Sequence, residues 1–114
     1  MVLNGTNLFL AFLVSLLISL GFWSVAQQDH KEIIALGSFV LSFTTLSSAG
    51  GIDYGYPRTN VNIRVLSGVF FLVGLITNSV FVIFWPSGQI YLACCGLLEI
   101  IFVVLLRSIL ATQQ

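Results

Sequence analysis

Charged side chains are scarce in this sequence of 114 residues, where aspartate, glutamate, lysine and arginine together make up only 7%. Hydrophobic residues make up 58%, and the mean hydropathy is +1.07. A water-soluble fold of this size needs far more polar surface, so most of the chain must lie in lipid. The composition therefore excludes an ordinary soluble domain and predicts an integral membrane protein.

Clusters of basic residues are also absent. The four lysines and arginines are balanced by four acidic residues, which gives a net charge of zero, and they form no run. Proteins that bind nucleic acid neutralise its phosphates with clustered lysine and arginine. We therefore expect no nucleic-acid partner and no strong patch for anionic lipids, and the lipid bilayer is the first partner.

Cysteine and histidine, the residues of many metal and catalytic sites, are few. The two cysteines, Cys94 and Cys95, are adjacent, and neighbours on a helix point about 100° apart, so they are not expected to form a disulfide. Core packing is the simplest role for both. The single histidine, His30, lies in a polar connection. No metal-ligand spacing and no nucleophile with a nearby base is present, so we expect no enzyme activity, metal or cofactor.

Four long apolar segments predict helices over about 8–26, 33–49, 62–85 and 90–110. Each is close to the roughly 20 residues that a helix needs to cross the hydrocarbon. Membrane β-strands alternate apolar and polar positions, and these segments do not. The prediction is an all-α membrane protein, with a single domain over 1–114 and four transmembrane helices in two antiparallel hairpins.

Three connections join these helices. In the first, Asp29 and Glu32 have the spacing of a capping box for the second helix. The last, 86–89, is a tight turn that makes the third and fourth helices antiparallel neighbours. The second connection, 50–64, is the only sizeable loop. It contains the candidate residues for contact with a partner: Tyr54, Tyr56, Arg58 and Arg64.

The distribution of basic residues predicts an orientation. With four spans, both termini and the second connection share one side, which holds Arg58, Arg64 and Arg107. The other side holds only Lys31. Because cytoplasmic loops carry the excess of lysine and arginine, both termini are predicted in the cytoplasm of a multi-pass protein of the plasma (inner) membrane.

Aromatic residues near the helix ends support the four-span count, since tryptophan and tyrosine favour the membrane–water interface. Trp23, Trp85 and Tyr91 are expected at one interface. Tyr54 and Tyr56 are expected at the other.

Glu99 is the one charged side chain well inside an apolar segment. A charge at the bilayer centre costs about 2.5–3.5 kcal/mol on insertion scales, so such a residue is rare and usually faces protein or a wet cavity. We expect a neutral acid unless a cation or water reaches it. Such an acid, bonded to Asn78 or to a hydroxyl of the second helix, has a purely structural role if it only fixes the helix register. The alternative is a site that takes up and releases a proton or binds a cation. At 1.5 Å per residue, Asn78 and Glu99 lie about 10 and 13 Å from the same interface, so we expect them to meet across the hairpin.

The second helix is rich in hydroxyls. Ser38, Ser42 and Thr45 fall on one face at i, i+4 and i+7. Close helix packing explains such a face, because small residues let backbones approach. A polar wall of a pore or cavity is the alternative. With Glu99 and Asn78, Ser42 and Thr45 are the candidates for binding a proton or cation.

Three functions stay open. The first is a proton- or cation-coupled transporter or channel subunit, working as a homo-oligomer because four short helices enclose little space. The second is a non-transporting partner in a membrane complex, such as an accessory, immunity or regulatory protein. The third is a holin-like pore former, although the charged tail often found in such proteins is missing. The isolated Glu99 favours the first function.

Overall fold

The structure is a computed structural model that describes residues 2–26, 31–84 and 88–112. Four helices are long and apolar enough to cross a membrane, which confirms the predicted all-α fold. They are α1 (Gly5–Val25), α2 (Lys31–Leu46) together with the π-helical turn η2 (Ser47–Gly51) that extends it, α3 (Pro57–Ile83) and α4 (Gly88–Thr112). Two short antiparallel strands are β1 (Val2–Leu3) and β2 (Ile52–Asp53).

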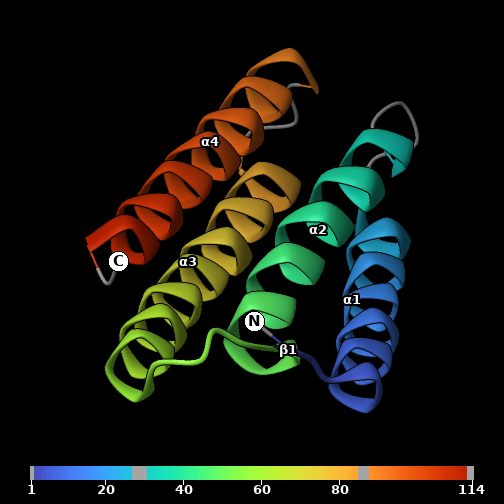
Figure 1. The fold of residues 1–114 in the computed structure, drawn as a ribbon. Coiled ribbons are helices and arrows are strands. Elements are labelled where there is room, and N and C mark those ends of the chain that lie inside the picture. The colour runs from blue at the N-terminus through green and yellow to red at the C-terminus, as the bar shows by residue number, and fades with distance from the viewer. Residues whose placement is uncertain (1, 27–30, 85–87, 113–114) are drawn as a thin grey trace.

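The helices run antiparallel in sequence order, and α2 lies in the middle of the bundle (Figure 1). It packs against α1, α3 and α4, so it joins the α1–α2 hairpin to the α3–α4 hairpin. The N-terminus, the connection from α2 to α3 and the C-terminal end of α4 lie at the same end of the bundle (Figure 1). We call this the terminal end.

Small side chains hold α1 against α2. The buried residues of α1 are Ala11, Ser15 and Ser19, spaced four apart on one face, and the Ser19 hydroxyl donates to the Ala35 carbonyl of α2 at 2.7 Å. Stripes of this kind let membrane helices approach closely. This stripe is not among the features predicted from the sequence, although its four-residue spacing is visible there.

Hydrogen bonds join the start of α1 to the π-helical turn. Asn4 caps α1 by accepting the Asn7 N–H, and its own N–H donates to the Gly51 carbonyl at 2.8 Å. The Asn7 side chain donates to the Gly50 carbonyl at 2.7 Å. These bonds, together with the β1–β2 pair, fix the N-terminus beside the second connection.

The third helix begins at Pro57, earlier than the predicted position 62, because proline is well suited to the first helical position. Arg58 and Arg64 therefore lie on the first turns of α3, and their placement in a loop was wrong. The Asn60 side chain accepts the Tyr54 N–H and donates to the Asp53 carboxylate, both at 2.9 Å. This ties the connection to the helix.

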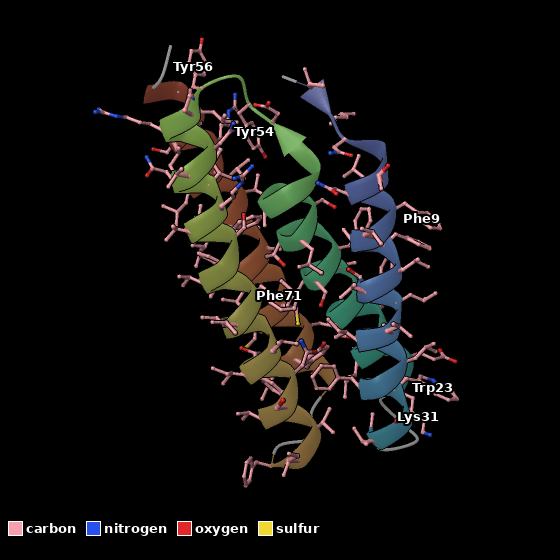
Figure 2. All side chains as sticks on the ribbon, turned by 90° about the horizontal axis from the view of Figure 1, so that it is seen from below. Phe9, Trp23, Lys31, Tyr54, Tyr56 and Phe71 are labelled. Carbon is pink, nitrogen blue, oxygen red and sulfur yellow. The ribbon has the colours of Figure 1, made fainter. Side chains whose placement is uncertain are left out.

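Aromatic side chains near both ends follow the predicted pattern only in part. Tyr54 and Tyr56 lie at the terminal end, and Trp23 lies at the opposite end, with the Lys31 ammonium 4.6 Å from its ring (Figure 2). Tyr91 was wrongly expected at an interface, since it is 1% exposed and lies inside the bundle. Trp85, like the Asp29 of the predicted capping box, lies outside the described residues.

Candidate functional site

Glu99 lies near the middle of α4 and is half-buried. Within the described residues its carboxyl has one hydrogen-bond partner, Thr44 of α2, with Thr44 Oγ1 and Glu99 Oε2 3.1 Å apart. Glu99 lines a groove of about 220 Å³ between α2 and α4. The remaining lining of this groove is apolar or small: Leu36, Gly37, Val40, Leu41, Leu92, Cys95 and Gly96.

The Thr44 hydroxyl has more acceptors than it can serve. Its oxygen also lies 2.8 Å from the Val40 carbonyl and 3.2 Å from the Leu41 carbonyl of its own helix. A hydroxyl has one proton to donate and can also accept. It can donate a hydrogen bond to an ionised Glu99. It can also donate to the Val40 carbonyl and accept a hydrogen bond from the O–H of a neutral Glu99. The pair is therefore compatible with both protonation states of the carboxyl.

Asn78 does not pair with Glu99, contrary to the expectation. Its side-chain nitrogen donates to the Gly74 carbonyl at 2.7 Å, and its oxygen accepts the Tyr91 hydroxyl. These bonds meet the hydrogen-bonding needs of an amide that is only 1% exposed.

The register between α3 and α4 explains why the pair is not formed. The rings of Phe70 and Phe102 lie 5.3 Å apart, which places Glu99, three residues before Phe102, level with Val73. Asn78 is five residues farther along α3, an offset of about 7.5 Å along the axis at 1.5 Å per residue. Depths counted separately from two helix ends did not capture this offset.

The hydroxyl face of α2 is buried away from Glu99. Ser38, Ser42 and Thr45 are all less than 5% exposed. Ser38 donates to the Ile34 carbonyl and Thr45 to the Leu41 carbonyl, each at 2.7 Å within α2. The residue of α2 that bonds to Glu99 is instead Thr44, which precedes Thr45 in the sequence and lies outside that face. The sequence could not have selected it, because nothing in the pattern tells which side of α2 meets α4.

A second polar cluster ties three helices together near the end opposite the termini. The buried Tyr91 hydroxyl contacts the Asn78 side chain of α3 and lies 3.2 Å from the Ile34 carbonyl of α2. The Tyr91 ring packs on Phe81, with centroids 5.4 Å apart. This cluster is in the core, and both cysteines are free beside it, Cys95 buried and Cys94 half-buried.

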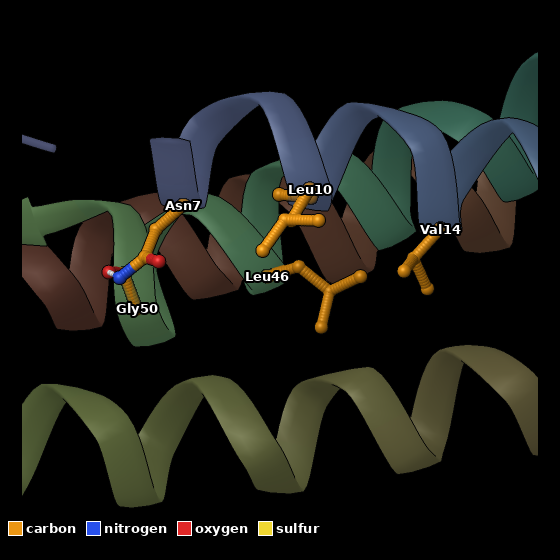
Figure 3. Close-up of a pocket in the computed structure, with 6 residues that line it drawn as sticks. Asn7, Leu10, Val14, Leu46 and Gly50 are labelled. Atoms are coloured by element: carbon orange, nitrogen blue, oxygen red, sulfur yellow. Dashed lines mark hydrogen bonds between the residues drawn. The ribbon is translucent and has the colours of Figure 1, made fainter. Parts of the chain in front are cut away.

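Other hollows offer less chemistry, and two of them lie near the terminal end. One, of about 230 Å³, lies beside α1 and η2, and none of its lining residues is ionisable (Figure 3). They are Asn7, Leu10, Ala11, Val14, Leu46 and Gly50. The other, of about 430 Å³, is a surface depression on α3 lined by Pro57, Arg58, Val61 and Asn62.

The predicted partner-contact residues at the terminal end differ in solvent exposure. Tyr54 is 7% exposed and therefore offers little surface to a partner. Tyr56, Arg58 and Arg64 are exposed.

In the part of the chain that the structure describes, no three histidine, cysteine, aspartate or glutamate side chains lie together as metal ligands would. Comparison of the chain with protein-family models, curated proteins and solved structures finds no match. The fold and the site themselves define the class. The chain is a small multi-pass α-helical membrane protein with a glutamate in the middle of its fourth span.

Proposed function

We propose that this protein is a subunit of a proton- or cation-coupled transporter or channel, in which Glu99 binds and releases the ion. The observation that carries the proposal is the setting of this carboxyl. It lies mid-way along a membrane-spanning helix and is half-buried, with one hydroxyl partner among the described residues and an open groove beside it. Ionisable residues in such positions usually mark ion or proton pathways.

The Thr44 hydroxyl supports a role in proton exchange. Thr44 can donate to the carboxylate or accept a hydrogen bond from the neutral acid, because in the second case its own O–H donates to the Val40 carbonyl. When Glu99 gives its proton to water that reaches it, or takes one from that water, rotation of the Thr44 hydroxyl keeps the hydrogen bond between the two side chains.

An oligomer is part of the proposal. The groove beside Glu99 is otherwise lined by apolar or small residues, so a single chain provides no polar route along this groove to either membrane surface. A second surface against the groove would enclose the carboxyl and create space that water or an ion can enter.

We also propose that the protein lies in the plasma (inner) membrane with both termini in the cytoplasm. Arg58 and Arg64 are exposed at the terminal end, and Arg107 lies near the C-terminal end of α4. The opposite end has Lys31. Three basic residues to one favour a cytoplasmic terminal end.

Flux through proteoliposomes tests the function. Purified protein is reconstituted with internal dyes that report pH, sodium and potassium, and proton, sodium and potassium gradients are imposed in turn. The wild type should pass one of these ions, and Glu99→Gln should fall to the level of empty liposomes, because the amide fits the site but cannot release a proton. Glu32→Gln makes the same change at an exposed position and should leave flux unchanged.

Full flux in Glu99→Gln, or no wild-type flux under any gradient, would contradict transport. The non-transporting membrane partner would then be the better account. Rapid, unselective leakage of the liposomes by every variant would favour the pore former.

A further inference from the structure

We infer that two copies of this chain pack through the groove between α2 and α4, about a twofold axis normal to the membrane, so that their Glu99 carboxyls form one shared site. This inference deepens the proposed function, because it concerns the same Glu99 site. It identifies the second surface that encloses the carboxyl as another copy of the protein.

The first argument is the unmet hydrogen bonding of Glu99. A neutral carboxyl has one donor and two acceptor oxygens, and an ionised one has two acceptors. Thr44 contacts only Oε2. Polar groups left without partners in hydrocarbon are strongly unfavourable, so the open side of Glu99 needs a polar neighbour. Lipid chains cannot supply it.

The second argument is that a carboxylic acid complements itself, since it carries both a donor and acceptors. A twofold axis normal to the membrane places identical residues of two copies at the same depth. The group that Glu99 can meet at its own depth is then Glu99 of the second copy. No other partner needs to supply a matching polar residue at this level.

The third argument is steric. Gly96 lies one turn before Glu99 on the groove, and a β-carbon built at this position would have no atom within 4 Å. Such a flat, open position lets another helix approach closely. The rim beside it consists of exposed apolar side chains that a second copy can cover, with Leu36 61% and Leu92 48% exposed.

Two carboxyls brought together in this way would share protons. Like charges at close range cannot both form in a low-dielectric site, so the pair would retain one proton or bind one cation between two carboxylates. The unit that exchanges an ion is then the dimer and not the single chain.

Photo-cross-linking tests the surface in liposomes that contain only this protein. A photoreactive amino acid in place of Leu92, on the groove, should give cross-linked dimers. The same residue in place of Leu17 on α1 or Ile76 on α3, both highly exposed elsewhere, should give few. Equal yields at all three positions, or cross-links confined to Leu17 or Ile76, would overturn the inference.

Dimerisation measured by fluorescence transfer at varied protein-to-lipid ratios tests the site. Glu99→Leu should shift the midpoint to roughly tenfold higher protein, as expected for the loss of the shared hydrogen bonds. Glu99→Gln should dimerise like the wild type, because an amide also complements itself. Gly96→Leu should block approach, whereas Gly68→Leu, at an equally open glycine of α3, should not. Normal dimerisation of both Glu99→Leu and Gly96→Leu would reject the proposed interface.

The two proposals fail separately. An oligomer that forms through a surface other than this groove, with flux that depends on Glu99, would overturn this inference and keep the proposed function. A dimer through the groove whose Glu99→Gln variant keeps full flux would overturn the proposed function and keep this inference. Helical content measured by circular dichroism confirms in each case that the variant is folded.

Discussion

Gly37 of α2 lies directly against the Tyr91 ring of α4, so close that a β-carbon at position 37 would stand 2.6 Å from the tyrosine oxygen. The ring cannot move aside easily, because it is 1% exposed and its hydroxyl contacts the Asn78 side chain and the Ile34 carbonyl. Glycine at this position is therefore what allows α2 and α4 to approach. It also sets the spacing of the groove that ends at Glu99.

Gly37→Ala should lower the free energy of unfolding by about 1–3 kcal/mol, the usual cost of inserting a methyl group into a filled core. Unfolding in mixed micelles with increasing denaturing detergent measures it. Gly68→Ala is the matched control, since a β-carbon there has no atom within 4 Å. It should be neutral or stabilising by about 0.5–1 kcal/mol, because alanine is the better helix residue. Equal effects of the two changes would contradict the clash.

Ser15 and Ser19 of α1 are both buried against α2 but differ in hydrogen bonding. Ser19 donates to Ala35, whereas the Ser15 hydroxyl has no partner within the described residues. Ser19→Ala should therefore destabilise the protein by about 0.6 kcal/mol, a typical value for a hydrogen bond between membrane helices. Ser15→Ala should be neutral or stabilising, because it removes an unsatisfied buried hydroxyl.

The same detergent titration distinguishes the two serines. A third variant, Ser15→Leu, tests the close approach itself and should destabilise by about 1–3 kcal/mol through overpacking. Should Ser15→Ala cost as much as Ser19→Ala, a partner of the Ser15 hydroxyl, such as a buried water, would have to be added to this interface.

The fold could be predicted from the sequence, whereas the partner of Glu99 could not. Hydropathy and segment length define four spans without any knowledge of neighbours, and they did so here. The partner of Glu99 depends on the rotation and offset of three helices. Thr44 and Thr45 differ by one position in sequence, yet one meets Glu99 and the other bonds within its own helix.

Tyr91 is a second residue whose surroundings could not be predicted from the sequence. A tyrosine one turn from the start of a spanning helix is usually an interfacial anchor. Here Gly37 leaves room for its ring inside the bundle, and Asn78 supplies a partner for its hydroxyl. Nothing in the sequence pairs these three positions, which are far apart along the chain.

Asp53 in the second connection should respond to pH. Its Oδ1 accepts the Asn60 side-chain N–H and the Gly55 N–H, both at 2.9 Å. The bond from Asn60, and next the bond from Gly55, hold the pKa of this carboxyl below its ordinary value of 3.8. The stabilisation of the turn is then complete above that value and is lost as pH falls through the lowered pKa.

The Gly55 amide chemical shift, followed by NMR in micelles, reports this titration. Its midpoint should lie below 3.8 in the wild type and move up toward 3.8 in Asn60→Ala, which removes the larger cause. Asn62→Ala, at an exposed asparagine two positions farther along α3, should leave the midpoint where it was. An unchanged midpoint in Asn60→Ala would mean that Asn60 does not stabilise the ionised Asp53.

The orientation can be tested with single cysteines at opposite ends of the bundle, in a protein whose Cys94 and Cys95 are replaced by alanine. Tyr56→Cys lies at the terminal end and Ser24→Cys at the other, and neither change alters the charge. If the terminal end is cytoplasmic, a membrane-impermeant maleimide added to intact cells should label Ser24→Cys alone. Tyr56→Cys should react only after the membrane is opened. The reverse pattern would contradict the predicted orientation.

A charge variant then tests the cause of that orientation. Arg58→Gln with Arg64→Gln leaves one basic residue at each end, Arg107 near the C-terminus and Lys31 opposite. If the excess of basic residues orients the protein, this double variant should insert in both directions, and the impermeant maleimide should then label part of each cysteine variant. Changing Glu32→Gln instead should leave the labelling pattern intact, because acidic residues contribute little to this bias. A single, unchanged orientation in the double arginine variant would show that the bias comes from some other feature of the chain.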